Sequence, residues 1–327
     1  MIAIAEGGYL LIQRYTVCIF LSFFLLSTIA HAEENVDIEQ QKITLYKQIE
    51  AITLIPWHYL AALNRYEANI AEDPAEDALI HINIPKEKWY GAAPVDEPID
   101  EETILLFGGI GKDGDGDGIA DRNNQYDILY TIANYLQQYG STPQDIRTGL
   151  WNYYKRELTV LSIMNYARLF DTYQKIDLDE TAFPIPKGYN YSYRNTWGDA
   201  RGFGGRRIHE GTDIFANYGT PVRATTYGII ELKGWNKYGG WRIGIRDIYN
   251  RYHYYAHLNG FADGLEIGDI VEAGQTIGSV GASGYGPPGT SGKFPPHLHY
   301  GLYKDNGKTE WSFDPFPNLK RWERKNP

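Results

Sequence analysis

The second half of the sequence contains Trp241-Arg242-Ile243-Gly244-Ile245-Arg246, in which apolar residues alternate with polar or small ones. This period-two alternation is typical of a β-strand that buries one face. The chain on both sides is rich in glycine and carries further short alternating runs. We therefore expect an antiparallel β domain over residues 179–327.

Residues 33–178 have a different pattern, with apolar residues at helical spacing. Pro56 is placed where a first helical residue belongs, and Thr142-Pro143-Gln144-Asp145 resembles a capping box. The apolar sets that define the expected helices are Leu45, Ile49 and Ile52; Leu60, Leu63 and Ile70; Tyr126 to Leu136; and Val160, Ile163, Ala167 and Phe170. Proline and glycine mark a boundary between residues 176 and 190. The predicted fold class is α+β, with a helical N-terminal domain before the β domain.

The composition excludes some classes of partner. The 327 residues are 43% hydrophobic and carry a net charge of −10, so the chain has the composition of a globular protein and would repel nucleic acid. We therefore expect no nucleic-acid partner.

The N-terminus resembles an export signal. Arg14 precedes an apolar run over residues 15–29, and Ala30-His31-Ala32 follows as a small-residue cleavage site. We expect residues 1–32 to be a signal peptide and the protein to be exported to the cell wall or the medium. An uncleaved segment would instead anchor the chain in a membrane. The single cysteine, Cys18, lies in this segment, so any metal in the remaining chain must be held by histidines and carboxylates.

Three histidine patterns follow in the β half: His209-Glu210-Gly211-Thr212-Asp213, Tyr255-Ala256-His257-Leu258 and Pro296-His297-Leu298-His299. In a strand, the two imidazoles of the last pattern point to the same face. Two imidazoles and one carboxylate suit a catalytic zinc ion, which keeps a fourth position for water. Two further histidines near such an ion can accept and donate protons near neutral pH.

Together with Gly219-Thr220-Pro221-Val222 and Gly274-Gln275-Thr276-Ile277-Gly278, these patterns resemble the M23 (lysostaphin- or LytM-type) metallopeptidase domain between about residues 183 and 322. The resemblance implies zinc ligands at His209, Asp213 and His299. It implies that His257 and His297 act as base or as stabilisers of the intermediate. It also implies a narrow groove over a small antiparallel sheet, and cleavage of peptide bonds in peptidoglycan.

Three further features lie near these motifs and are not part of them. His253 is expected to share a strand face with His257 and to support the site or face the substrate. The loop at residues 284–294 is long and is expected to form a wall of the groove. Arg206 and Arg207 precede His209, and they either bind a substrate carboxylate or remain solvated.

The helical half carries a second candidate acid. Residues 55–67 resemble the catalytic-glutamate helix of lysozyme-like lytic transglycosylases, with Glu67 on the apolar face of the helix. A carboxyl in apolar surroundings can act as a general acid on a glycosidic oxygen. The glycine-rich stretch that follows the glutamate in that family is absent, so the domain resembles a diverged lysozyme-like domain. The alternative is a helix carboxylate satisfied by a neighbour.

The loop Asp113–Asp121 matches the calcium pattern D-x-D-x-D-G-x-x-D. Position twelve is Asn124 rather than a bidentate glutamate, which predicts weak, structural Ca²⁺ binding. The alternative is an acidic, glycine-rich loop without an ion.

A diverged lysozyme-like half joined to an M23 half resembles the spore-cortex L-Ala–D-Glu endopeptidases. Our leading hypothesis is therefore a secreted zinc endopeptidase of sporulation that cuts peptidoglycan stem peptides, with the L-Ala–D-Glu bond as the candidate bond. A bifunctional hydrolase that also cleaves glycan with Glu67, and a non-catalytic wall-binding activator, are the alternatives.

Overall fold

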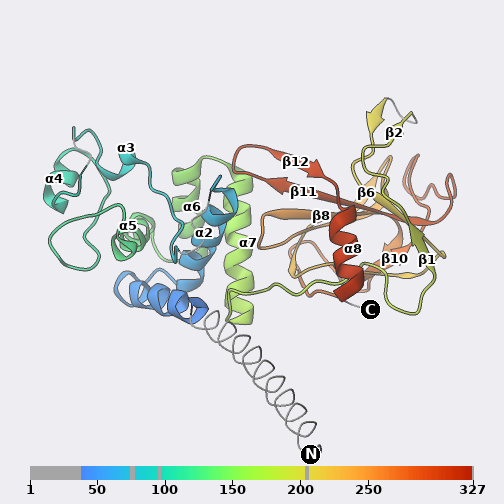
Figure 1. Cartoon of the computed structure of the whole chain (residues 1–327), viewed down its shortest axis with the longest axis horizontal. Helices are drawn as coiled ribbons and strands as arrows, with labels where there is room; N and C mark the ends of the chain where they lie inside the picture. The colour runs from blue at the N-terminus through green and yellow to red at the C-terminus, as the bar shows by residue number, and fades with distance from the viewer. Residues whose placement is uncertain (1–37, 74–77, 95–96, 203–205, 326–327) are drawn as a thin grey trace, which may run out of the picture.

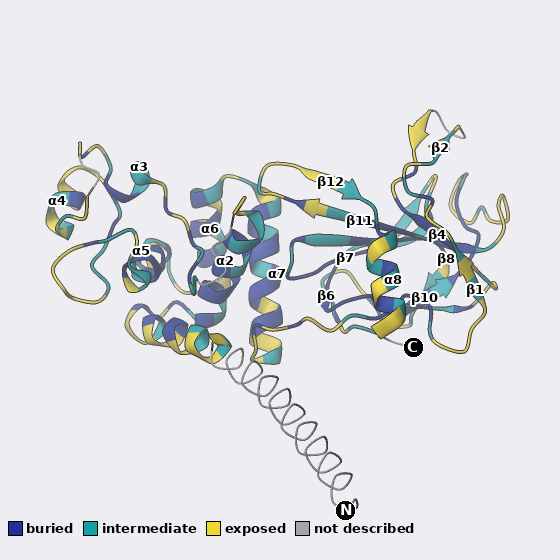
Figure 2. Cartoon of the chain, in the orientation of Figure 1, coloured by how far each residue is buried: buried dark blue, intermediate teal, exposed yellow. Residues whose placement is uncertain are grey.

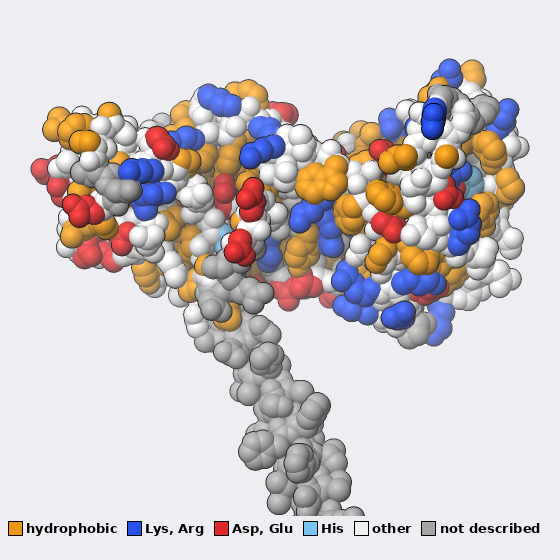
Figure 3. All heavy atoms as spheres, turned by 45° about the horizontal axis from the view of Figure 1, so that its top comes forward, with side chains coloured by type: hydrophobic (Ala, Val, Ile, Leu, Met, Phe, Trp, Pro, Cys, Tyr) orange, Lys and Arg blue, Asp and Glu red, His pale blue; other side chains and the backbone are white. Residues whose placement is uncertain are grey.

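The computed structural model describes residues 38–73, 78–94, 97–202 and 206–325. A helical half and a sheet half lie side by side, so the chain has the predicted α+β fold (Figure 1). The expected signal peptide, residues 1–32, lies outside the described residues. Within the described ranges, none of the helices combines the length and apolar composition that crossing a membrane requires. On the face shown in Figure 3, acidic and basic side chains are interspersed over both halves.

The helical half contains the expected helices and two short additional ones. Residues 38–53 are helical, and the later helices are α2 (Trp57–Ile70), α3 (Lys86–Trp89), α4 (Glu101–Leu106), α5 (Gln125–Gln137), α6 (Pro143–Tyr154) and α7 (Glu157–Tyr173). The capping box is present, because Thr142 and Asp145 accept each other's backbone N–H groups at the start of α6. Pro56 is not the first helical residue, as predicted, but the residue before it. Its ψ of 136° is not helical, and it precedes the first residue of α2.

The sheet half is built around one large sheet of antiparallel pairs. The main path runs β1-β4-β11-β8-β7-β6-β9, with β12 beside β11, and β10 between β8 and β5. The strands of this sheet are β1 (Tyr191–Tyr193), β4 (Thr212–Ala216), β5 (Pro221–Arg223), β6 (Gly228–Asn236), β7 (Gly240–Arg246), β8 (Arg251–Phe261), β9 (Ile270–Val271), β10 (Thr276–Val280), β11 (His297–Asp305) and β12 (Glu310–Phe313). A separate pair consists of β2 (Ala200–Arg201) and β3 (Arg207–Ile208).

The C-terminal helix α8 (Phe316–Lys325) was not predicted. It buries Leu319 and Trp322 and leaves most of its other residues exposed or half-buried (Figure 2). The indole of Trp322 stacks on the ring of His253, with the ring centroids 6.2 Å apart. Two buried apolar residues among so many charges are too weak a pattern for a helix to be expected.

The two halves share part of their core. Tyr227, Ile229 and Ile248 of the sheet half are buried in the same apolar cluster as the helices. Arg156, at the start of α7, donates two hydrogen bonds of 2.8 and 2.6 Å to the carboxylate of Asp305, which is fully buried at the end of β11. The end of β11 that lies away from its histidines is therefore fixed against the helices.

Candidate metal centre and catalytic groove

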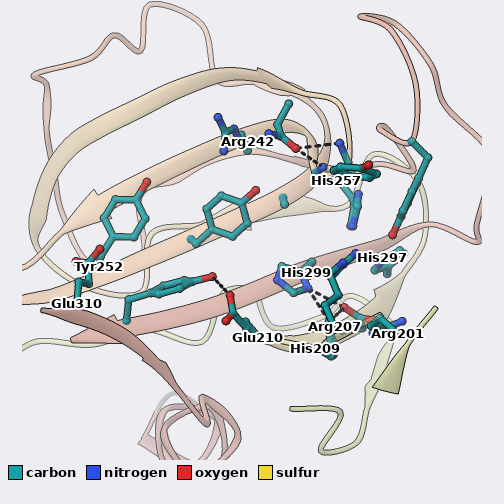
Figure 4. Close-up of a pocket in the computed structure, with 18 residues that line it drawn as sticks. Arg201, Arg207, His209, Glu210, Arg242, Tyr252, His257, His297, His299 and Glu310 are labelled. Carbon is teal, nitrogen blue, oxygen red and sulfur yellow. Dashed lines mark hydrogen bonds and ion pairs between the residues drawn. The ribbon is translucent and has the colours of Figure 1, made fainter. Parts of the chain in front are cut away.

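Two adjacent strands bring the three candidate metal ligands together. In the antiparallel pairing of β4 with β11, Asp213 lies directly opposite His299. His209 comes from the loop between β3 and β4, four residues before Asp213. The close-up shows His209 and His299 facing each other in the groove (Figure 4).

Three donor atoms converge at this point. His209 Nε2 and His299 Nδ1 are 2.8 Å apart, and they lie 3.0 and 3.1 Å from Asp213 Oδ1. These separations are a few tenths of an ångström shorter than the roughly 3.3–3.6 Å between tetrahedral ligands that lie about 2.0–2.2 Å from a zinc ion. Two imidazoles and one carboxylate form a common zinc donor set, so the residues present fit a zinc ion.

Neighbouring groups orient the ligands. His209 Nδ1 donates a hydrogen bond of 2.8 Å to the Thr196 carbonyl oxygen, and this contact directs Nε2 toward Asp213 and His299. Arg201 donates a hydrogen bond of 2.6 Å to Asp213 Oδ2 and leaves Oδ1 facing the imidazoles. Gly211 makes room for His299, because a Cβ at that position would lie 2.5 Å from the imidazole Cε1.

The protonation states favour cation binding. Burial alone would raise the pKa of Asp213, but hydrogen bonds from His209 and His299 outweigh it and hold that pKa well below its usual range. Burial lowers the pKa of His299, and its hydrogen bond with Asp213 opposes this only in part. The site therefore holds an anionic carboxylate, and burial favours the neutral form of His299 that a metal ion requires.

A β-bulge places His257 in the groove. The register between β7 and β8 shifts so that Arg242 lies opposite both Ala256 and His257. His257 has a positive φ of 61°, a strained conformation for a residue with a side chain. The shift turns His257 to the same face as Ala256, although the two are consecutive, and both line the groove.

His257 and His297 lie beside the metal ligands. Their ring centroids are 4.7 Å apart, and that of His257 is 6.1 Å from that of His299. Both rings place Nδ1 against a backbone carbonyl, of Ser283 at 2.8 Å and of Pro295 at 2.7 Å, so Nδ1 donates in each ring and Nε2 is the nitrogen left for other partners. Burial and repulsion from His297 and His299 lower the pKa of His257 to about 3, so its ring is neutral at neutral pH.

These residues line a groove of about 370 Å³ that runs along β8 and β11. One wall includes Tyr285 from the long 284–294 loop, whose ring stacks on His257 with the planes 15° apart. The floor continues past Tyr254 and Tyr252 to Glu310 on β12 (Figure 4).

Sequence reasoning missed several lining residues. Arg201, Arg242, Tyr252 and Tyr254 were not singled out. The sequence did contain a pattern that places Arg242. It alternates with Trp241, Ile243 and Ile245, so its side chain must lie on the face of the strand opposite to the two isoleucines, which enter the core. Arg201 belongs to a two-residue strand and carries no comparable pattern.

The expectation for His253 is wrong. Its ring is fully buried on the core side of β8, with Nε2 3.0 Å from Asp247 Oδ2 and Nδ1 2.8 Å from the hydroxyls of Thr225 and Tyr300. The bulge is the reason: regular alternation puts residues 253 and 257 on one face, and one extra residue separates them.

Glu67 lies outside the groove, on the buried face of α2. Its side chain accepts a hydrogen bond from Tyr154, and burial raises the pKa of its carboxyl to about 7 against that bond. The hydrogen bond is the arrangement expected for a satisfied helix carboxyl, and the lysozyme-like role remains a prediction.

The acidic loop gathers a different set of residues from the predicted one. Carboxylate oxygens of Asp113, Asp115 and Asp127 lie within 4.8 Å of one another. Asp127 was not part of the pattern. Asn124, the twelfth position, instead donates to Asp115 and caps α5. Calcium binding remains a prediction.

Comparisons with known proteins agree with the geometry. The model of peptidase family M23 matches residues 207–312. The chain is 60% identical over 289 residues to an L-Ala–D-Glu endopeptidase of Bacillus subtilis, covering 87% of this chain and 89% of that protein. It is 39% identical over 116 residues to lysostaphin of Staphylococcus staphylolyticus, covering 35% of this chain and 22% of that one. The solved catalytic domain of the antimicrobial peptidase lysostaphin from Staphylococcus simulans is 34% identical, with a TM-score of 0.32, covering 40% of this chain and 92% of that domain. With its five motif residues gathered in one groove, the chain belongs to peptidase family M23.

Proposed function

We propose that the protein is a zinc-dependent endopeptidase that hydrolyses the L-Ala–D-Glu bond of peptidoglycan stem peptides. The observation that carries the proposal is the convergence of His209, Asp213 and His299 within 3.1 Å, with His257 and His297 beside them in an open groove. The choice of bond is supported by the 60% identity to the Bacillus subtilis enzyme of that name, which extends over both halves of the chain.

His209, Asp213 and His299 would hold the zinc ion, which supplies Lewis acidity that polarises a carbonyl and makes water a nucleophile near neutral pH. His257 and His297 present Nε2 to the groove, so either can take a proton from the attacking water. The imidazolium formed can stabilise the negative oxygen and then pass its proton to the leaving nitrogen. The C–N bond breaks, and a carboxylate and a free amine result.

The test is digestion of peptidoglycan by the purified protein, followed by mass spectrometry of the fragments. We expect new N-terminal D-Glu ends, one bound zinc per chain, and loss of both in His299→Ala. His81→Ala, in the helical half, is the matched control and should keep both. Protein that binds no zinc and releases no amine would contradict the proposal.

The same digest tests the alternatives. Sugar cleavage that disappears in Glu67→Gln would support a bifunctional hydrolase, and binding to peptidoglycan without any product would support an activator.

We also propose that the chain is exported, with residues 1–32 removed, and that residues 33–178 and 179–327 form its two domains. N-terminal sequencing of protein from the culture medium tests the cleavage site. Ca²⁺ titration of the purified protein, with Asp113→Asn as the variant, tests the acidic loop.

A further inference from the structure

Arg242 projects from the wall of the groove beside a catalytic histidine. On β7, Ile243 and Ile245 enter the core of the sheet, whereas Arg242 lines the groove. The register shift between Trp241 and Ile243 leaves Arg242 beside the bulge that contains Ala256 and His257 on the neighbouring strand. Neighbouring strands are about 4.8 Å apart, and Arg242 and His257 line the same groove. Figure 4 shows Arg242 and His257 on the same side of the groove, across from Glu210.

The charge of Arg242 is not neutralised by a carboxylate among the residues that the structure describes. Arg246, four residues further along β7, is 2% exposed and pairs with Glu231 and Glu310 at 3.0 and 2.8 Å. Arg242 forms no ion pair with a carboxylate of the described residues. Its hydrogen-bond partner there is the phenol of Tyr254, and its Nε is buried without a partner. A partly buried guanidinium with unfilled donors is suited to an anionic ligand.

The other cations of the groove are less suited. Arg201 already binds Asp213 Oδ2. Arg207 on β3 is exposed, so water and salt screen its charge. Of the three lining arginines, Arg242 is the one that combines partial burial with a free charge.

The proposed substrate supplies an anion at the matching place. A glutamyl residue has two carboxyl groups, and the peptide continues through only one of them. In an L-Ala–D-Glu bond the scissile nitrogen belongs to the D-Glu residue, so the remaining carboxylate lies within a few bonds of the bond that is cut.

Building on the proposed function, we propose that Arg242 determines specificity by binding the free carboxylate of the D-glutamyl residue at the scissile bond. The guanidinium can donate two parallel hydrogen bonds to a carboxylate, which an amide in the same place cannot accept equally well. The enzyme would therefore prefer D-Glu over its amidated form at this position.

The experiment combines two substrates with a small set of variants. The substrates are a short stem peptide with L-Ala–D-Glu and the same peptide with the free D-Glu carboxyl amidated. For the wild-type, zinc-loaded protein we expect kcat/KM to be about 10- to 100-fold higher for the acid, the range of a charge-assisted hydrogen bond. In Arg242→Gln we expect the two values to agree within about threefold, because the acid loses its advantage. Arg206→Gln, an exposed arginine outside the groove lining, should keep the wild-type preference.

Several results would overturn this inference. These are equal cleavage of both peptides by the wild type, an unchanged preference in Arg242→Gln, or loss of the preference in Arg207→Gln instead. Zinc content and thermal unfolding check that Arg242→Gln is folded. If it is not, Arg242→Lys, which keeps the charge but cannot donate two parallel hydrogen bonds, should give an intermediate preference. A full preference in Arg242→Lys would contradict the proposal. If the wild type cleaves neither peptide, the proposed function itself fails, and this inference fails with it.

Discussion

The two halves of the molecule each bury a carboxyl, and the two carboxyls behave in opposite ways. Glu67 in the helical half is 9% exposed, and Asp213 in the sheet half is 6% exposed. Burial raises the pKa of Glu67 to about 7, whereas the pKa of Asp213 is held well below its usual range despite burial. Exposure is nearly the same, so burial cannot explain the difference.

The neighbours explain it. Glu67 receives a hydrogen bond from the neutral phenol of Tyr154. Asp213 is hydrogen-bonded by His209, His299 and the guanidinium of Arg201, all of which favour the charged form. Hydrogen-bond donors around Asp213 therefore favour its anionic form, which a metal ligand requires, whereas burial of Glu67 favours its protonated form.

The largest expected effect comes from removing the charge of Asp213. In Asp213→Asn the two imidazoles lose their anionic partner, so we expect zinc to be lost and peptidase activity to fall by at least about 1000-fold. Zinc analysis and the muropeptide digest measure this. Glu67→Gln is the matched change in the other half and should leave zinc content unaltered. Equal zinc loss in both variants would end the contrast between the two carboxyls.

The next effect concerns stability and pH. Because burial raises the pKa of Glu67 from 4.5 to about 7, the folded protein keeps a proton that the unfolded chain releases in this window. The stabilisation is thus present below about pH 4.5 and is lost as the pH rises to about 7, by up to about 3 kcal/mol.

Urea unfolding at pH 5 and pH 8 tests this. Glu67→Gln should lose part of the decline in stability between these two values, and Glu72→Gln, an exposed change at the end of the same region, should not. An identical decline in wild type and Glu67→Gln would show that Glu67 is charged throughout.

A methyl group added at Gly211 tests how far zinc binding beside Asp213 depends on the position of the His299 ring. A Cβ on Gly211 would lie 2.5 Å from His299 Cε1 and 2.7 Å from the Tyr300 carbonyl oxygen. We expect Gly211→Ala to displace the ring and weaken zinc binding by about 10- to 100-fold. Gly260→Ala has open space around the added methyl and should bind zinc like the wild type. Competition with a chelator gives both affinities, and equal values would contradict the prediction.

The smallest effect is expected for the outer partner of Asp213. Arg201→Gln removes the 2.6 Å bond to Oδ2 but leaves both imidazoles, so zinc affinity should fall by about tenfold. Arg206→Gln is the exposed control. A change below twofold in Arg201→Gln would mean that the histidines alone define the state of Asp213.

Much of the fold could be predicted from local patterns. The stripe on α7 and the alternation on β7 each reflect one buried face, and the capping box of α6 needs only four residues. The metal site could be predicted through its motifs, since His209 and Asp213 are four residues apart and His297 and His299 are two apart. The bulge at His257 could not, because it depends on the pairing of two strands, and it reversed the expectation for His253. Arg201 could not be assigned either, since only the tertiary structure brings its two-residue strand to Asp213.

The two hydrogen bonds between Arg156 and Asp305 have a consequence for the sheet half when it is separated from the helices. Both the candidate metal ligand His299 and the clamped Asp305 belong to β11, and the apolar cluster of the helices is completed by residues of the sheet half. Cutting the chain between its halves would leave a fully buried carboxylate and several apolar side chains facing water. The sheet half of this protein therefore depends on the helical half for part of its stability. Residues 179–327 produced without the helices should therefore unfold at a lower temperature than the whole chain.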